Sequence, residues 1–311
     1  MLVGTYHCHC RLQTPAHLPA FKGSTLRGGF GHALRKVACA LRRQTCQDCL
    51  LGSSCAYAVI FETQPASRAG QEDAARIAAR PHPYVFMVPQ DARQEFAAGD
   101  EFEFGLGLFG KANEYLPHIV YAIENLGGLG LGRSSANGLG RFSLVAVTRD
   151  GEEIYRADTK VLRHASPLIP LSVQPAAHGG ATSLAIDLIT PLRLKQDNHF
   201  QTSLPFHMLV RAALRRISSL ENAYGEGEPA LDYAGLVRRA QNVTLGHSTC
   251  QWVELERYSN RQKTAMLMGG LLGTLRYEGN LDEYVPLLKY CEKTHLGKQT
   301  SFGLGQIQVH I

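Results

Sequence analysis

Four cysteines near the N-terminus are spaced as ligands of one metal ion would be. They are Cys39, Cys46, Cys49 and Cys55, in the pattern C-x6-C-x2-C-x5-C. Cys46 and Cys49 can form a two-ligand turn, and the outer cysteines come from the flanking elements. Four thiolates suit a structural Zn²⁺ ion, and clustered cysteines in a cytosolic protein favour metal over disulfides. The alternatives are unligated buried thiols, an iron–sulfur cluster and a redox-active C-x-x-C.

A glycine-rich run near the C-terminus has the composition of a phosphate-binding loop. Residues 295–305 read HLGKQTSFGLG. Glycines let backbone amides approach a phosphate closely, and Lys298 adds a positive charge. The run is not a Walker loop, because Gly-Lys comes at its start and no Gly-x-x-x-x-Gly precedes it. A turn that packs a helix on a sheet explains the glycines equally well.

A second glycine pattern, GLGLFG at residues 105–110, matches the Gly-x-Gly-x-x-Gly of dinucleotide sites. Such a site also requires an acidic residue after the next strand to hold the ribose. Here a helix follows instead, and the nearby acid, Glu124, lies on that helix. Dinucleotide binding is therefore the weaker interpretation.

Hydrophobic periodicity predicts the elements that must position these residues. The predicted helices are residues 24–43, 111–125, 202–221 and 281–293. The predicted strands are residues 2–12, 59–61, 84–88, 101–108, 142–147, 183–189, 252–258, 273–277 and 306–311.

The two halves of the chain follow one plan. Each begins with a strand and a long helix, and each ends with a helix, a glycine-rich loop and a strand. GLGRF at residues 138–142 corresponds to GLGQI at residues 303–307. This predicts an α+β protein of two tandem ferredoxin-like (RRM-like) domains, 1–155 and 156–311, with a Cys-rich insertion after the first helix.

Composition and charge narrow the class of protein. The chain has 311 residues, 44% of them hydrophobic and 19% charged, which excludes a largely disordered protein. No apolar run is long enough for a membrane span, and no secretory signal is recognisable, so a cytoplasmic location without membrane contact is expected. The net charge is +5, and 23 of the 32 basic residues are Arg. Arg grips phosphate in two places, so this bias favours a nucleic-acid partner, although a GC-rich genome would produce the same bias.

Several segments together resemble the CRISPR-associated endoribonucleases of the RAMP superfamily, which process precursor CRISPR RNA. The resemblance covers essentially the whole chain and is carried by these segments: KGSTLRGGFG (22–31), PLRLK (191–195), RYSNRQ (257–262), GGLLG (269–273), YEG (277–279) and residues 297–305. It implies two ferredoxin-like domains and metal-free cleavage, in which the 2′-hydroxyl of the RNA attacks the adjacent phosphorus and leaves a 2′,3′-cyclic phosphate.

The resemblance also implies that a histidine of the first helix takes part in catalysis, and this helix contains one, His32. At 100° per residue His32 lies opposite the apolar stripe, with Lys36 one turn further on and Gly28 and Gly29 before it. We expect His32 and Lys36 to act in cleavage, with His295 as the alternative histidine. A solvated helix face would look the same.

The residues expected to contact RNA are basic side chains and members of the glycine loop. They are Lys22, Arg27, Arg35, Arg257, Arg261, His295, Gly297, Lys298, Thr300, Gly303 and Gly305. The expected partners are CRISPR repeat RNA and other CRISPR-associated effector subunits. A non-catalytic RAMP subunit that holds RNA is the first alternative, and a nucleotide-dependent enzyme using residues 105–110 is the second.

Overall fold

A computed structural model describes most of the chain. The described residues are 1–41, 43–63, 80–132, 135–163, 166–174, 180–196, 199–200, 203–259 and 264–311. They form two compact units, which divide between Ile169 and Pro170; the first residue joins the C-terminal unit, and residues 223–225 join the N-terminal one. Among the described residues, no helix is long and apolar enough to cross a lipid bilayer.

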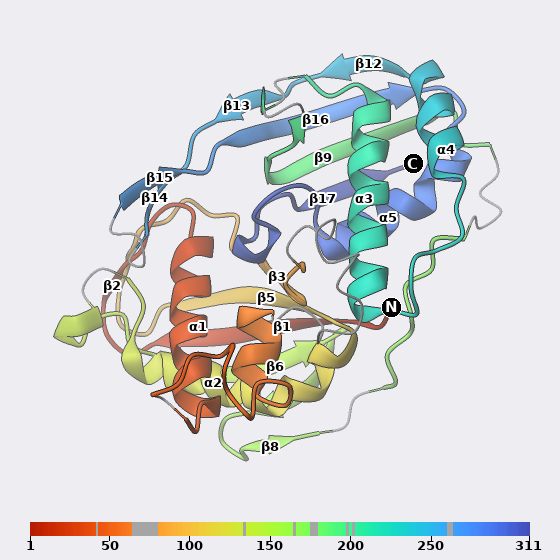
Figure 1. The fold of residues 1–311 in the computed structure, drawn as a ribbon. Coiled ribbons are helices and arrows are strands. Elements are labelled where there is room, and N and C mark those ends of the chain that lie inside the picture. Colours follow the sequence, from red (N-terminus) through yellow and green to blue (C-terminus); the bar gives the residue numbers. More distant parts are fainter. Residues whose placement is uncertain are drawn as a thin grey trace. The chain divides into compact units, whose positions relative to one another are not determined.

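The N-terminal unit has the β-α-β-β-α-β order of a ferredoxin-like fold. Its main elements are β1 (Val3–Leu12), α1 (Gly23–Ala38), β3 (Tyr84–Met87), β5 (Glu101–Phe109), α2 (Leu116–Leu129) and β6 (Phe142–Arg149). The strands lie in the order β3-β5-β1-β6, and all of these pairs are antiparallel. Figure 1 shows α1 and α2 together on one face of this sheet, where they enclose an apolar core.

The sheet of the N-terminal unit continues beyond β6 through β7 (Glu152–Arg156) and β8 (Val161–Leu162). These two strands carry the unit past residue 155, where the sequence placed the domain boundary. The smaller elements are β2 (Ala16–His17), β4 (Glu95–Phe96), a short helix at Ala58–Glu62 and 3₁₀ turns at Gly110–Tyr115 and Ser135–Asn137.

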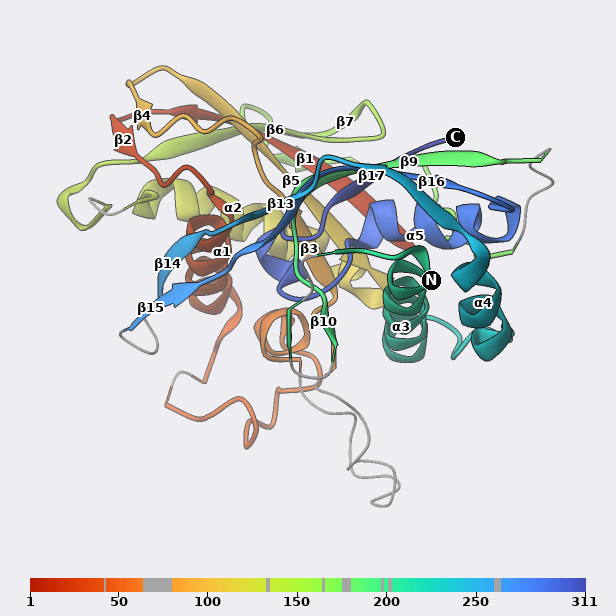
Figure 2. The ribbon, with the colours of Figure 1, turned by 90° about the horizontal axis from the view of Figure 1, so that it is seen from above.

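The C-terminal unit repeats this plan. Its main elements are β9 (Ser183–Leu192), α3 (Phe206–Tyr224), β12 (Thr244–Ser248), β16 (Gly270–Glu278), α5 (Val285–Thr294) and β17 (Ile307–His310). The strand order, β12-β16-β9-β17, has the same topology as the N-terminal sheet. Figure 2 shows α3 and α5 lying along one side of this sheet. The duplication and the ferredoxin-like fold predicted from the sequence are thus confirmed.

Further elements decorate the C-terminal unit. They are α4 (Tyr233–Arg239), β10 (Lys195–Gln196), β11 (His199–Phe200), β13 (Gln251–Val253), the hairpin strands β14 (Glu256–Ser259) and β15 (Thr264–Leu267), and 3₁₀ turns at Ala240–Asn242, Asp282–Tyr284 and Thr300–Phe302. The predicted strand 252–258 is therefore two strands, β13 and β14.

One predicted strand is a helix. Residues 59–61 (Val-Ile-Phe) favour a strand by residue type, yet they lie in the short helix Ala58–Glu62. This helix buries Ile60 and packs the Phe61 ring where a side chain at Gly31 would otherwise stand. The predicted first helix is also shorter than expected, because α1 ends at Ala38 and Cys39 is already extended.

Candidate functional site

The outward face of α1 carries the histidine and lysine predicted to act in catalysis. His32, Arg35 and Lys36 are exposed, whereas Phe30, Leu34 and other apolar residues of the helix are buried. Within the described part of the chain, no hydrogen bond or ion pair occupies the side chain of His32 or Lys36. The predicted helix geometry is confirmed, and both groups are available to a ligand.

The surface beside His32 is open. Gly28 is exposed, and a Cβ added there would meet no atom within 4 Å. Gly29 and Gly31 serve packing instead, because a Cβ at either position would overlap Leu126 or Phe61. The bare turn that the sequence predicted next to His32 is therefore reduced to Gly28.

Arg27 and Arg35 rest on aromatic rings contributed by the segment that follows the cysteines. The Arg27 guanidinium lies 4.5 Å from the centroid of Phe61, and Arg35 lies 5.8 Å from that of Tyr57. The two rings stack on one another with centroids 5.5 Å apart. We call Tyr57 and Phe61 the aromatic shelf; it orients both arginines by cation–π contact.

A neighbouring polar group also contacts Arg27. Its guanidinium nitrogen is 3.2 Å from Nε2 of His82. Burial raises the pKa of Tyr84 to about 12, and the charge of Arg27 opposes that rise. Arg27 is half-buried, so it presents only part of its guanidinium to solvent.

Lys22 is a structural residue and does not suit the predicted RNA contact. Its side chain is 3% exposed, and its ammonium donates to Asp91 at 2.8 Å. It also lies 5.7 Å from the ring of Phe96. The Lys22 ammonium is therefore buried and paired with Asp91, which the sequence pattern alone could not show.

The four predicted metal ligands line one pocket at the C-terminal end of α1. All eight cysteines of the chain lie in described segments, and all are free thiols. Burial raises the pKa of Cys46, and Glu62, Cys39 and Cys55 raise it further. No three His, Cys, Asp or Glu side chains of the described segments are arranged as a formed metal site.

The C-terminal glycine loop is held closed by its own backbone. Leu296 N–H donates to the carbonyl of Gly305 at 2.8 Å, and Gly305 N–H donates to that of Pro191 at 3.1 Å. The Thr190 hydroxyl donates to the carbonyl of Gly303 at 2.7 Å. A Cβ at Gly305 would overlap the carbonyl of Leu296, and a Cβ at Gly297 would overlap that of Arg193.

The N-terminal unit contains the same set of loop-closing hydrogen bonds, which we call the frame. Leu131 N–H donates to Gly140 at 2.9 Å, Gly140 N–H donates to Pro15 at 2.8 Å, and the Thr14 hydroxyl donates to Gly138 at 3.2 Å. The predicted correspondence of the two halves included their glycines but not a Thr-Pro pair, which follows β1 in the N-terminal unit and lies at the end of β9 in the C-terminal unit. The repeated Leu-x-Thr-Pro at residues 12–15 and 188–191 was the signal available.

Several loop residues that were expected to contact RNA also have a structural role in this closed loop. Gly297, Gly303 and Gly305 have φ values of 80°, 90° and 70°, so glycine is required there by the fold itself. Thr300 is 8% exposed. These residues shape the loop, and their direct contact with RNA stays a prediction.

His295 is also structural, contrary to its expected RNA contact and its place as the alternative catalytic histidine. It is 1% exposed, and Nδ1 lies 3.3 Å from the carbonyl of Leu304. Burial, helped by the nearby charge of Arg216, lowers the pKa of His295 to about 3. A neutral, enclosed imidazole cannot exchange protons with a substrate at neutral pH.

Two predicted RNA contacts of the C-terminal unit are well placed. Lys298 is exposed, and its side chain has no hydrogen bond or ion pair within the described segments. Arg257, on β14, lies 4.6 Å from the ring centroid of Phe302 in the glycine loop. The structure therefore brings Arg257 and the loop together. Arg261 lies outside the described residues.

The dinucleotide-type motif at 105–110 is part of a strand. Gly105 and Gly107 lie inside β5, paired with His7 and Thr5 of β1. A Cβ at Gly110 would overlap the carbonyl of Tyr224. Gly105 and Gly110 serve packing, and Gly105 and Gly107 lie within a strand and not in the strand-to-helix loop that a pyrophosphate requires.

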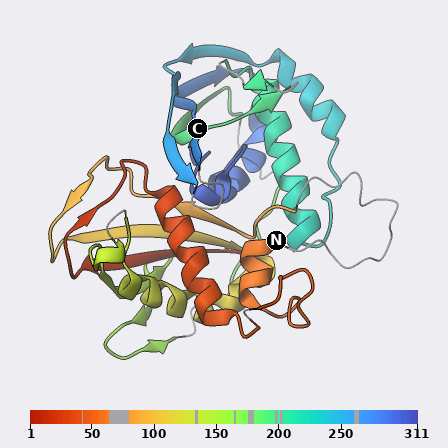
Figure 3. The same cartoon turned by 60° about the vertical axis from the view of Figure 1, so that its left-hand side comes forward.

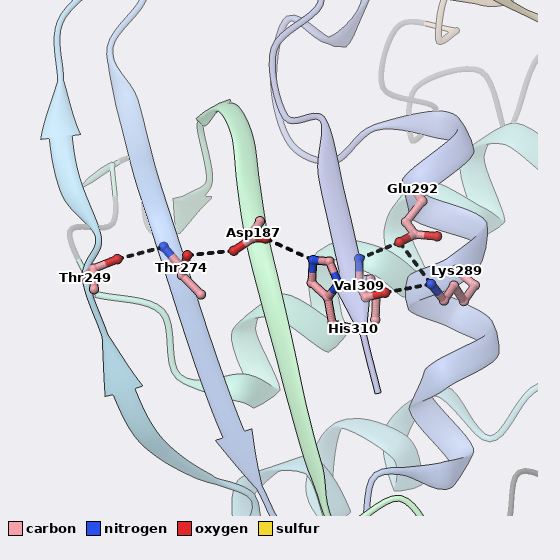
Figure 4. A network of polar contacts seen from close by, with 7 residues as sticks. All are labelled: Asp187, Thr249, Thr274, Lys289, Glu292, Val309 and His310. Carbon is pink, nitrogen blue, oxygen red and sulfur yellow. Dashed lines mark hydrogen bonds and ion pairs between the residues drawn. The ribbon is translucent and has the colours of Figure 1, made fainter. Parts of the chain in front are cut away.

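A polar network on the sheet of the C-terminal unit was not foreseen. Figure 4 shows Asp187 between His310 and Thr274, at 2.9 Å from His310 Nε2 and 2.6 Å from the Thr274 hydroxyl. The hydrogen bond from the Thr274 hydroxyl lowers the pKa of Asp187, and the hydrogen bond and charge of His310 lower it to a lesser extent. The three side chains come from β16, β9 and β17, so only sheet pairing brings them together.

Family models match both halves. Residues 1–167 match AF_1859_N, an N-terminal domain, and residues 186–307 match the CRISPR-associated endoribonuclease Cas6. An uncharacterized protein of Archaeoglobus fulgidus is 28% identical over 297 residues, which cover 94% of this chain and 93% of that protein.

Solved structures share the fold. Thermus thermophilus Cas6 superimposes with a TM-score of 0.58 at 10% identity, covering 99% of this chain and 98% of that one. A Cas6 product complex gives 0.56 at 14% identity over the whole of both chains. A partial Cas6-RT-Cas1–Cas2 complex gives 0.58 at 11% identity, and there this chain spans 46% of a longer one. The chain therefore belongs to the family described by AF_1859_N, its residues 186–307 match the CRISPR-associated endoribonuclease Cas6 domain, and it shares the fold of solved Cas6 proteins.

Proposed function

We propose that this chain cleaves CRISPR repeat RNA, with the 2′-hydroxyl of the RNA as nucleophile. The 2′-oxygen forms a bond to phosphorus, the bond from phosphorus to the 5′-oxygen breaks, and a 2′,3′-cyclic phosphate and a 5′-hydroxyl result. One group must take the proton of the 2′-hydroxyl, and another must give a proton to the leaving oxygen. The negative charge on the phosphorane favours a nearby cation.

The observation that supports this proposal is the pair His32 and Lys36. Both side chains are exposed, neither has a hydrogen bond or ion pair to another described residue, and they lie one turn apart on α1. Residues four apart on a helix bring their Cβ atoms to about 6 Å, within reach of one phosphate group. His32 then acts as general base or acid, and Lys36 stabilises the charge that develops on the phosphate.

RNA binding in this proposal draws on both units. Arg27 and Arg35, oriented by the aromatic shelf, contact phosphates at the N-terminal unit. Lys298 and Arg257, at the glycine loop, contact them at the C-terminal unit. The Cas6 product complex and the Cas6-RT-Cas1–Cas2 complex among the structural relatives support repeat RNA and other CRISPR-associated proteins as the partners.

The test is single-turnover cleavage of repeat RNA by His32→Ala, with the exposed helical histidine variant His118→Ala as the matched control. We expect His32→Ala to slow cleavage on the order of 10²–10⁴-fold with little change in RNA affinity, and His118→Ala to leave both unchanged. A 2′-deoxy nucleotide at the cleaved position should abolish the reaction, and brief EDTA should not.

Two results would overturn the assignment. Wild-type rates in His32→Ala would remove His32 from the reaction. Cleavage of the deoxy substrate would exclude attack by the 2′-hydroxyl. RNA binding without any cleavage by the unaltered chain would instead identify a non-catalytic RNA-holding subunit.

A further inference from the structure

The segment between α1 and the aromatic shelf has little apolar burial to hold it. Residues 40–55 contain turns, such as Gly52 N–H to the carbonyl of Cys49 at 2.9 Å, and no strand among the described residues. Leu50 is 88% exposed, and Leu51 is 44% exposed. Segments that bury so little apolar surface commonly depend on a metal ion for a defined structure.

The cysteines lie where a metal ion would supply that structure. Cys39 directly follows α1, and its N–H still bonds to the carbonyl of Arg35 at 3.0 Å. The backbone carbonyl of Cys55 accepts a hydrogen bond from the N–H of Val59 at 2.9 Å and so begins the helical turn that carries the aromatic shelf. Cys46 and Cys49 lie between them in the sequence, and all four cysteines line one pocket together with Ala38 and Ala58.

The same segment determines where the aromatic shelf stands. Tyr57 and Phe61 follow Cys55 by two and six residues, and Phe61 packs directly against the backbone of α1 at Gly31. Arg27 and Arg35 lie over these rings. A link between Cys39 and Cys55 therefore ties both ends of the segment to one helix. Figure 3 shows this segment, in orange, beside α1.

We propose that Cys39, Cys46, Cys49 and Cys55 bind one structural zinc ion, which fixes the aromatic shelf against α1 and so orients Arg27 and Arg35. All four side chains line one pocket, and ligation requires the thiols to move closer together as the ion binds. The consequence for RNA affinity rests on the proposed function, whereas the metal site itself does not.

The first experiment measures metal by elemental analysis in protein purified without chelator. We expect about one zinc per chain, and loss of that zinc in Cys46→Ser and Cys49→Ser. Cys250→Ser is the matched control, since Cys250 is equally half-buried but lies in the C-terminal unit, and it should keep the metal. Zinc-free, folded wild-type protein would overturn the proposal, and so would iron in place of zinc.

The second experiment separates the metal site from RNA binding and guards against variants that fail to fold. Prolonged treatment of the wild type with a strong zinc chelator should lower its melting temperature, and added Zn²⁺ should restore it. RNA affinity should fall on the order of tenfold, as expected for the loss of one charge-assisted contact. A reversible melting shift with unchanged affinity would keep the zinc site and overturn its link to Arg27 and Arg35.

Discussion

The glycine loop of the N-terminal unit begins at Gly130, and the corresponding loop of the C-terminal unit begins at His295. Both residues end a helix with positive φ, at 83° and 58°, and ψ near 160° in each case. The backbone bonds that close the two loops are the same, yet one half uses glycine and the other a buried imidazole. The glycine pattern is therefore required by the fold itself, and each half adds its own side chains to it.

The side chains presented by the two loops differ as well. In the C-terminal loop Phe302 supports Arg257, and Lys298 is exposed. At the place of Phe302 the N-terminal loop has Asn137, which is exposed. The RNA-binding role proposed for the C-terminal loop therefore rests on Lys298 and Arg257, because the glycines are already required by the fold.

The largest effect is expected from the last glycine of each loop. Gly305→Ala and Gly140→Ala both place a Cβ against a carbonyl oxygen at positive φ, so each should cost about 3 kcal/mol or more of unfolding free energy. Gly99→Ala, at φ 92° in open space, is the control and should cost about 1 kcal/mol.

The unfolding of each unit can be measured separately in these variants. Fluorescence of Trp252, the one tryptophan of the chain, follows the C-terminal unit, and amide hydrogen exchange follows the N-terminal unit. A neutral outcome at either loop would break the equivalence of the two frames.

The second prediction concerns His295, which stands where the N-terminal loop has Gly130. The pKa of His295 is lowered to about 3 from 6.5. Between these pH values His295 is protonated in the unfolded chain but neutral in the folded unit. The contribution of His295 to the free energy of unfolding is therefore fully present above about pH 6.5 and is lost as the pH falls toward 3.

His295→Gly, which copies Gly130, should remove this dependence. Between pH 7.5 and pH 4.5 the wild type should lose about 2–3 kcal/mol more than the variant, as measured by denaturant unfolding followed at Trp252. Equal losses would show that His295 titrates normally in the folded protein.

The third prediction compares the two threonines of the frame. Thr190 is 2% exposed, and its hydroxyl both donates to Gly303 and accepts from Gln306 N–H at 2.9 Å. Thr14 makes the corresponding bonds at 3.2 and 3.0 Å and is less buried. Thr190→Val should therefore cost about 1–3 kcal/mol and Thr14→Val about 1 kcal/mol. The reverse order in chemical denaturation would contradict this account.

The fourth prediction concerns RNA. Lys298→Ala should weaken RNA binding several-fold and lower the slope of log affinity against log salt by about 1, because one phosphate contact is lost. Lys293→Ala, an exposed lysine of α5, is the control and should change neither quantity. Equal slopes for wild type and Lys298→Ala would make the C-terminal loop purely structural, like the frame it shares.

The smallest effect is expected on the C-terminal sheet. Asp187 has a lowered pKa because of Thr274 and then His310, so its contribution is present at neutral pH and is lost as pH falls below the usual Asp range. The pair with His310 is partly solvated, so Asp187→Asn should cost about 0–1 kcal/mol at pH 7 and less at pH 3. Chemical denaturation at both pH values measures this, and a larger loss at the lower pH would reverse the assignment.

Local patterns in the sequence determined the repeated strand–helix plan, the outward face of α1 and the grouping of four cysteines. Each depends on residues close together in the chain, where helical period and spacing set the geometry. The tertiary structure alone decided that Lys22 and His295 are buried and that Arg27 and Arg35 lie over aromatic rings. It also decided that residues 59–61 form a helix and that Asp187 meets His310. These outcomes depend on packing and pairing between distant segments, which override the preference of a residue type.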